Sequence, residues 1–200
     1  MKSSRFVFIG VGGQGNLLAS RLLGEAALAS SIPAVVSEIH GMAQRGGIVE
    51  SAVLLGDVTS PIVSQAEADV LIGFEPLETL RALNKCNGES LIITNTRPLP
   101  PFTVAVGQGK YPPVEEILPL LKAKVAEVIS LDANSIAEKA GNPLSLNMVM
   151  LGALIGSGTT QIHPETVREV ISRFTKKAFL ESNLAAFNGG VDLVRNSRSG

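Results

Sequence analysis

A glycine-rich loop between an apolar run and a helical pattern constrains the fold of this chain more than any other feature. Residues 5–10 (RFVFIG) are almost continuously apolar, which is typical of a strand buried on both faces of a sheet. Glycines then follow with the spacing G-x-G-x-x-G over residues 10–15. Residues 14–30 repeat leucine and alanine at the spacing of one helix face. A strand, a tight turn and a helix in this order favour a layered α/β domain.

Short apolar runs continue to alternate with helical patterns along the chain. Further strands are predicted over residues 34–36, 48–55, 69–74, 91–94, 103–106 and 125–131. Helices are predicted from Ser60-Pro61, from Pro76 to near Asn87-Gly88, and over 115–124, 133–140, 143–155, 164–179 and 181–187. This order predicts an α/β fold, a Rossmann-like doubly wound mostly parallel sheet with C-terminal helices. Residues 1–190 are expected to form a single domain, and residues 191–200 a flexible tail.

The glycine loop has the chemistry of an anion site. Glycines let the backbone turn tightly, and the following helix offers free N–H groups that favour a phosphate. Glu38, placed 23 residues after Gly15, lies near the position of the ribose-binding acid in a dinucleotide fold. A nicotinamide-binding oxidoreductase is therefore one alternative, and a glycine turn that only packs the helix against the sheet is another.

Polar residues follow the predicted strands at the points where they end. In a doubly wound sheet these ends share one edge, where ligands bind. The residues concerned are Gln14, His40, Glu75, Asn95 and Asp132. Each has a structural alternative, such as a helix N-cap for Asp132. Their common location predicts that this edge faces a ligand or a partner.

Residues 37–47 (SEIHGMAQRGG) form the most specific segment. Arg45 lies between flexible residues and could bind a carboxylate or phosphate through two hydrogen bonds. His40 could titrate near neutral pH. An exposed turn with a solvated Arg45 is the alternative.

Composition excludes several classes of protein. The net charge is −1 and Lys176-Lys177 is the only basic pair, so nucleic-acid binding is not expected. No apolar stretch is long enough to span a membrane, and a cytoplasmic location is expected. The single cysteine, Cys86, cannot alone ligate an iron–sulfur cluster, and no GDG-type segment for magnesium diphosphate is present.

Four segments together resemble a known family. They are IGVGGQGNLLASRLLGEAA, SEIHGMAQRGGIVES, ADVLIGFEPLETL and NMVMLGALIG, in this order. The chain resembles the β subunits of indolepyruvate:ferredoxin oxidoreductases, which correspond to the γ domain of 2-oxoacid:ferredoxin oxidoreductases. The resemblance covers roughly residues 5–190, and related subunits acting on pyruvate or 2-oxoglutarate usually differ before the Arg-Gly-Gly.

The resemblance implies a reaction that the chain does not perform alone. Indolepyruvate and coenzyme A would become indoleacetyl-CoA and CO2, with two electrons passing to ferredoxin. Thiamine diphosphate, Mg and [4Fe-4S] clusters are expected on the large α subunit. A chain without these cofactors cannot perform the reaction, because they carry out its difficult electronic steps. Other 2-oxoacids, such as pyruvate or 2-oxoisovalerate, remain alternative substrates, and a non-catalytic scaffold module remains an alternative function. Because the partner-facing surface would be bare in the isolated subunit, a homodimer is an expected form of it.

The resemblance, together with the strand end at Asn95, gives the candidate site residues, none of them catalytic or metal-binding. Ligand or anion contacts are expected from Gly12, Gly13, Gln14, Gly15, Arg45, Gly46 and Asn95. Interface or substrate-cleft positions are expected for His40, Glu75 and Asn147.

Overall fold

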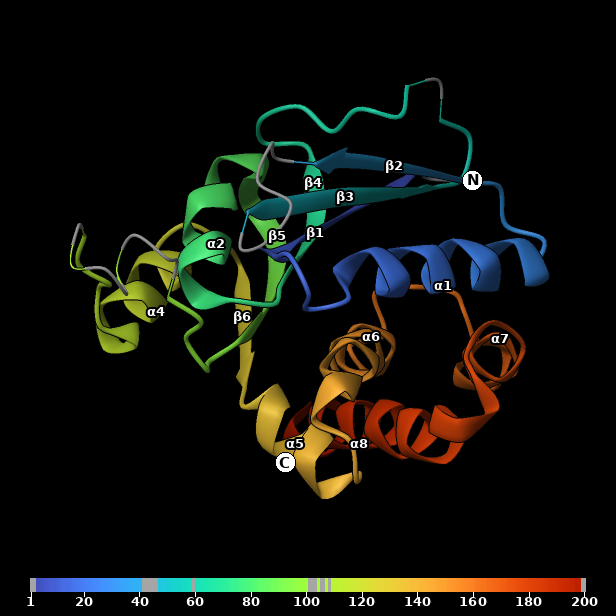
Figure 1. Ribbon diagram of the computed structural model, residues 1–200. Coiled ribbons are helices and arrows are strands. Elements are labelled where there is room, and N and C mark those ends of the chain that lie inside the picture. The colour runs from blue at the N-terminus through green and yellow to red at the C-terminus, as the bar shows by residue number, and fades with distance from the viewer. Residues whose placement is uncertain are drawn as a thin grey trace.

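A central strand, β1, organises a sheet that helices cover on both faces (Figure 1). The computed structural model describes residues 3–40, 47–58, 60–100, 104, 107 and 109–198. In this part the sheet has six strands in the order β2-β3-β1-β4-β5-β6. They are β1 (Ser4–Val11), β2 (Ala34–His40), β3 (Ile48–Leu55), β4 (Ala68–Gly73), β5 (Cys86–Asn95) and β6 (Glu127–Leu131).

All the described strands except β3 run in the same direction. Strands β4, β5 and β6 extend the sheet from β1 in parallel, and β3 pairs antiparallel with both β1 and β2. The predicted mostly parallel α/β sheet is therefore confirmed, with one reversed strand inserted beside β1. Strand β2 therefore ends, and β3 begins, at the edge where β1, β4, β5 and β6 end.

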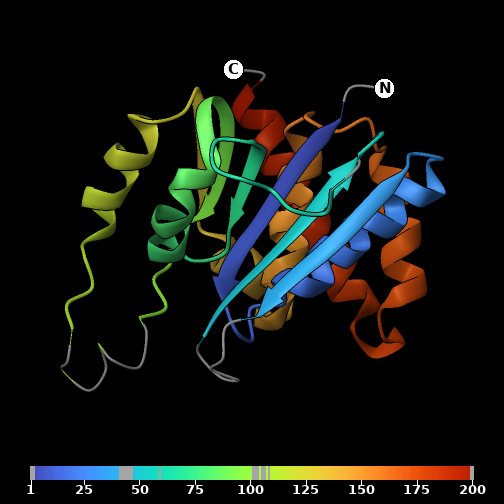
Figure 2. The same ribbon diagram turned by 90° about the horizontal axis from the view of Figure 1, so that it is seen from above.

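Helices lie on both faces of the sheet. Helices α1 (Asn16–Ala29), α5 (Ala133–Lys139), α6 (Leu146–Gly156), α7 (Pro164–Phe174) and α8 (Leu180–Arg198) cover one face. Helices α2 (Pro76–Arg81) and α4 (Val114–Lys122) cover the other, as the view from above also shows (Figure 2). Short 3-10 turns η1 (Ala82–Lys85), η2 (Pro143–Ser145) and η3 (Lys177–Phe179) complete the elements.

The alternation of side chains along β1 explains the two cores. Phe6 and Phe8 pack with α1 and the C-terminal helices, whereas Val7 and Ile9 pack under α2 and α4. All four are almost completely buried. Because successive residues of a strand point to opposite faces, a continuous apolar run is what a doubly covered strand requires.

Glycines allow α6 and α8 to cross at close range. A Cβ atom on Gly152 of α6 would lie 2.0 Å from the carbonyl oxygen of Phe187, and one on Gly190 of α8 would lie 2.1 Å from that of Val149. Every residue of α6 is buried. The two helices therefore pack backbone against backbone.

Several predicted boundaries are wrong. No helix begins at Ser60-Pro61, where the Ser60 hydroxyl instead accepts a hydrogen bond from the N–H of Ile62, a local turn that competes with helix formation. Strand β5 begins five residues early, because Cys86 pairs with Ala68, so Asn87-Gly88 lies in a strand instead of ending a helix. Helix α7 stops at Phe174, since Thr175 is extended.

The segment predicted as a flexible tail is mostly helical. Helix α8 continues to Arg198, and Val191 and Val194 are buried against the C-terminal helices. These apolar contacts hold residues 191–198 in the domain. The strand predicted over residues 103–106 falls, apart from Val104, outside the described residues.

Candidate functional site

The ends of the parallel strands bring the predicted polar residues to one edge of the sheet, which we call the rim. The rim comprises the glycine loop 12–15, the ends of β2, β4, β5 and β6, and the N-terminus of α5. The prediction that these strand ends share an edge is confirmed by the pairing of the strands. Their roles in ligand binding remain predictions.

The glycine loop needs its glycines for two reasons. Gly13 and Gly15 have φ values of 102° and 77°, a region that side chains with a Cβ disfavour. Gly10 and Gly15 are also crowded: a Cβ would lie 2.8 Å from Gln14 Oε1 and 2.7 Å from Asn147 Nδ2, respectively. Space around Gly13 is open, with no described atom within 4 Å of the position that a Cβ would take. The loop is thus tightly supported from below and accessible at Gly13.

A backbone hydrogen bond links the glycine loop to Gly47, the last residue of the segment 37–47. The N–H of Gly12 donates to the carbonyl of Gly47 at 2.9 Å. Gly47 ends the segment that contains Arg45 and Gly46, and both of those residues lie outside the described residues. His40 is the last residue of β2, paired with Val49 of β3. The start of β3 is therefore held beside the glycine loop.

One carbonyl, that of Phe74, joins three parts of the rim. Gln14 Nε2 donates to it at 3.0 Å and Asn95 Nδ2 at 3.1 Å. Gln14 Oε1 in turn accepts from the N–H of Val11 at 2.8 Å. The glycine loop, the end of β4 and the end of β5 are therefore fixed relative to one another.

Asn95 is 1% exposed and all of its polar hydrogens and its oxygen are engaged. Its Nδ2 also donates to Asn134 Oδ1 at 2.9 Å, and its Oδ1 accepts from the N–H of Ala133 at 3.1 Å. These contacts make Asn95 a residue that positions the loops around it. They fit an indirect role at the rim better than the direct ligand contact that the sequence predicts.

Glu75 is a buried carboxylate that holds three backbone segments together. It is 1% exposed and caps α2 by accepting from the N–H of Glu78 at 2.9 Å. Its other oxygen accepts from the N–H of Leu99 at 3.1 Å and from the hydroxyl of Tyr111. Burial, followed by the hydrogen bond to Glu75, raises the pKa of Tyr111, so the phenol stays protonated as a donor.

A second buried carboxylate lies beside it. Glu78 is 2% exposed, and burial raises its pKa, an effect that Arg81 at 2.6 Å partly offsets. Its Oε2 has no hydrogen-bond partner within the described part of the chain. Two buried acids at the start of one short helix make the donors to Glu75 important, because a buried charge is costly without hydrogen bonds.

The variant Tyr111→Phe tests whether Glu75 holds these backbone segments together. The variant is expected to lose about 1–2 kcal/mol of unfolding free energy, because a buried carboxylate oxygen loses one of its two donors. Urea denaturation followed by circular dichroism measures the change. Unchanged stability of Tyr111→Phe would contradict this role of Glu75. The variant Tyr111→Leu would show how much of any loss comes from the packing of the ring.

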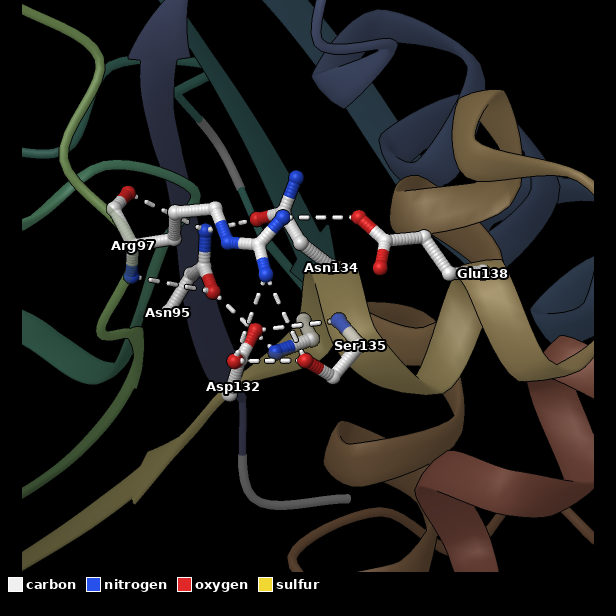
Figure 3. Close-up of polar contacts among 7 residues, drawn as sticks. Asn95, Arg97, Asp132, Asn134, Ser135 and Glu138 are labelled. Atoms are coloured by element: carbon white, nitrogen blue, oxygen red, sulfur yellow. Dashed lines mark hydrogen bonds and ion pairs between the residues drawn. The ribbon is translucent and has the colours of Figure 1, made fainter.

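Arg97 makes an ion-pair cluster that the sequence does not predict (Figure 3). Its guanidinium lies 2.7 Å from Glu138 Oε1 and 3.6 Å from Asp132 Oδ2. Asp132 also caps α5 as predicted, accepting from the N–H of Ser135 at 3.0 Å. Burial opposes ionisation of Asp132, but the hydrogen bonds from Ser135 and the charge of Arg97 outweigh it and lower its pKa. Only the position of Arg97 two residues after Asn95 could have indicated this cluster.

Asn147 connects the glycine loop to α6. It is 5% exposed, and its Nδ2 donates to the carbonyl of Gly15 at 3.3 Å. The contact supports the start of α1 from below. Asn147 therefore lies behind the loop, away from the open side at Gly13.

A pocket of about 180 Å³ opens beside the loop. Its lining residues are Gly13, Gln14, Arg97, Pro98, Leu99, Asn134, Pro143, Leu144 and Leu146. Of the residues predicted to bind a ligand, Gly13 and Gln14 line it directly, whereas Asn95 lies beneath it through its bond to Asn134. At the rim this pocket offers both polar and apolar groups to a ligand.

The chain does not fit a cofactor that needs thiolates. Cys86 is fully buried in the second core, and burial raises its pKa to about 11. Among the described residues no group of three or more His, Cys, Asp or Glu side chains could hold a metal ion. Likewise, no described helix is both long and apolar enough to cross a bilayer.

The strand order argues against a nicotinamide site built on Glu38. In a dinucleotide-binding fold the strand that carries the acid lies next to β1. Here β3 separates the two, with Glu38 in register with Ser51 and Ser51 with Phe8. Since neighbouring strands lie about 4.8 Å apart, β2 is roughly 10 Å from β1. Glu38 is therefore one strand too far from the glycine loop.

Comparison with known families identifies the domain. Residues 5–193 match the family model described as pyruvate ferredoxin/flavodoxin oxidoreductase. The chain belongs to this family. This match confirms the family predicted from the four segments.

A relative of similar length supports this assignment, and a solved structure shows the same fold. The chain is 42% identical over 188 residues to the indolepyruvate oxidoreductase subunit IorB of Methanothermobacter thermautotrophicus, and the match covers 94% of this chain and 96% of that protein. It is similar in structure to the γ subunit of a keto/oxoacid ferredoxin oxidoreductase from Geobacter sulfurreducens, with a TM-score of 0.71, 22% identity, and 97% and 99% of the two chains covered.

The same fold occurs inside a longer chain of the family. A 2-oxoglutarate:ferredoxin oxidoreductase from Magnetococcus marinus, solved with 2-oxoglutarate, coenzyme A and succinyl-CoA bound, matches with a TM-score of 0.74 and 19% identity. The match covers 98% of this chain and 32% of that one. At this identity the likeness establishes the shared fold.

Proposed function

We propose that this chain is the small subunit of an indolepyruvate:ferredoxin oxidoreductase. The observation that carries the proposal is 42% identity to an IorB subunit with nearly complete coverage of both chains. Other IorB subunits, such as that of Archaeoglobus fulgidus at 40% identity over 192 residues, agree. Subunits for 2-oxoglutarate are more distant, at 27% identity.

In this function the chain supports the coenzyme A-dependent oxidative decarboxylation of aryl pyruvates. The products are an aryl-acetyl-CoA such as indoleacetyl-CoA, CO2 and reduced ferredoxin. A large α subunit would supply thiamine diphosphate with Mg for decarboxylation and [4Fe-4S] clusters for electron transfer. The single buried cysteine agrees with this division, since the chain has no thiolates to hold a cluster.

The contribution of this chain is to bind and orient coenzyme A at the rim. Gly13 is exposed in the glycine loop, and the start of α1 adds the positive end of a helix dipole. Gly46 and Arg45 lie one and two residues before Gly47 in the sequence, and Gly47 bonds to Gly12. We therefore expect Arg45 and Gly46 to contact the same anion. Gly12 and Gly15 shape the loop, Asn147 bonds to it, and Asn95 shares the Phe74 carbonyl with Gln14. Glu75 instead holds the backbone at Leu99. His40 ends β2, and we assign this position to the substrate cleft.

Two alternatives from other classes remain to be separated by experiment. A stand-alone NAD(P)-binding oxidoreductase would need Glu38 at the ribose, which the strand order does not favour. A non-catalytic scaffold would need only the partner-facing surface. If residues 37–47 do not determine which 2-oxoacid is accepted, the substrate would be pyruvate or 2-oxoisovalerate in place of an aryl pyruvate.

Co-expression with the large subunit tests the function. The complex is expected to reduce a viologen dye with indolepyruvate and coenzyme A, with a higher kcat/KM than with phenylpyruvate, pyruvate, 2-oxoisovalerate or 2-oxoglutarate. The isolated chain should show no turnover and no change in NADH fluorescence. Activity or tight NADH binding by the chain alone would contradict the proposal, and equal activity of the large subunit without this chain would favour the scaffold function.

A further inference from the structure

Strand β2 is the last strand on one side of the sheet. Within the part of the chain that the structure describes, its one neighbouring strand is β3 (Figure 2). Along the seven residues Ala34–His40, the backbone N–H and C=O groups that point away from β3 therefore have no paired strand. Such an edge is a template on which a further strand can pair.

The edge has few of the features that usually keep edge strands apart. Natural edge strands are often protected by lysine, by proline or by a bulge. The sequence of β2, AVVSEIH, contains neither lysine nor proline, and its register with β3 is continuous from Ala34 to His40. Its one carboxylate is that of Glu38. A strand of this length and composition is expected to pair on its outer side.

Apolar side chains are exposed beside the edge on both faces of the sheet. Val36 lies on the face that α1 covers and is 39% exposed, whereas Ile39 lies on the opposite face and is 58% exposed. Ile62 is 65% exposed in the neighbouring segment, which the Ser37 hydroxyl holds by donating to the Pro61 carbonyl at 2.8 Å. The chain itself therefore covers the edge on neither face.

The sequence of β2 is complementary to itself in the antiparallel direction. When Ser37 is placed opposite Ser37 of a second copy, all seven residues of the strand pair. Val35 then lies opposite Ile39, and such pairs of β-branched residues stabilise neighbouring strands. Glu38 lies opposite Val36, so the two carboxylates avoid the directly opposed position that destabilises a strand pair.

We propose that β2 pairs with β2 of a second copy of this chain, about a two-fold axis at Ser37, so that two sheets join into one. Each copy contributes the same residues, as in other two-fold interfaces. Because the axis reverses the strand direction, the two rims lie at opposite ends of the joined sheet and each stays open to its own large subunit. The interface goes beyond the proposed function, from which only the large subunit in the test is taken.

Cysteine cross-linking on the complete enzyme complex tests the pairing. In the proposed register the two Cα atoms at position 37 lie about 5 Å apart, so Ser37→Cys is expected to form a disulfide between two small subunits under mild oxidation. Ala34→Cys is the matched control. Since Ala34 pairs with His40, two cysteines at position 34 would lie about 20 Å apart and should not join. The native Cys86 is fully buried and does not compete.

A charge on the edge tests the same contact in a second way. Adding Ile39→Lys to Ser37→Cys places an ammonium group opposite Val35 of the second copy. Cross-linking is then expected to be about tenfold slower, since the pair loses two contacts between Val35 and Ile39. Leu193→Lys adds the same charge at an exposed leucine of α8 and should leave the rate unchanged.

The outcomes separate the possible occupants of the edge. If Ser37→Cys cross-links no faster than Ala34→Cys, or if Ile39→Lys does not slow the reaction, β2 does not pair with itself and the proposal is wrong. If Ile39→Lys instead releases the small subunit from the large one, the large subunit covers this edge and the proposal is overturned. Viologen reduction with indolepyruvate and coenzyme A on the same preparations tests the proposed function separately, because cross-linking does not depend on turnover.

Discussion

Gly152→Ala is expected to lower the free energy of unfolding by about 2–3 kcal/mol. In an isolated helix, alanine would be preferred over glycine by about 1 kcal/mol. Here the added methyl group would lie 2.0 Å from the carbonyl oxygen of Phe187 and 3.1 Å from the backbone nitrogen of Val191. Because both are backbone atoms, no change of rotamer can relieve the clash. Helices α6 and α8 would have to move apart, and the buried core between them would open.

Urea denaturation monitored by circular dichroism measures this effect. Gly88→Ala is the matched control, because Gly88 is exposed in β5 and a Cβ there meets no described atom within 4 Å. The control should remain within about 0.5 kcal/mol of the parent protein. Equal stability of Gly152→Ala and Gly88→Ala would show that α6 and α8 do not cross as closely as described.

Asn95→Asp is expected to cost about 3 kcal/mol at neutral pH, the scale of an uncompensated buried charge. The substitution keeps the shape of the side chain and the acceptor for the N–H of Ala133. It replaces the donor to Phe74 and Asn134 by an oxygen that faces two other oxygens. Burial and this repulsion would raise the pKa of the new carboxyl in the folded state above its unfolded value.

The sign of the pH dependence follows from that shift. A raised folded-state pKa means that the ionised form is disfavoured by folding, so the loss develops as the pH rises through the unfolded-state pKa and diminishes in acid. Unfolding free energies of the variant and the parent protein should be compared at each pH. Asn84→Asp, at an exposed position, is the matched control and should show little change. A loss of the same size at every pH would indicate that lost shape, not charge, causes the effect.

The local parts of the fold could be predicted because their signals are local. The run 5–10, the glycine spacing and the leucine pattern of α1 each lie within one element, and the structure confirms all three. The common edge of the strand ends follows from parallel topology alone. The sequence therefore placed Gln14, Glu75 and Asn95 at the correct edge of the sheet. Ligand contact was expected for Gln14 and Asn95, and the structure shows both of them bonded to the Phe74 carbonyl.

Interactions between distant residues could not be predicted in this way. Tyr111 reaches Glu75 across 36 residues, and Glu138 reaches Arg97 across 41. Neither pair produces a periodic pattern. The insertion of β3 between β1 and β2 is equally nonlocal, because strand order depends on which edges pair and not on the residues within each strand. That order is also what separates Glu38 from the glycine loop.

The bond between Gly12 and Gly47 has an evolutionary consequence. The turn between β2 and β3 is fixed at its two ends, by the pairing of His40 with Val49 and by this bond. Substitutions between residues 41 and 46 would therefore leave the ends of β2 and β3, and the glycine loop bonded to Gly47, in place. Duplicated genes could therefore diversify in sequence between these two fixed points while the rest of the domain remained under unchanged selection.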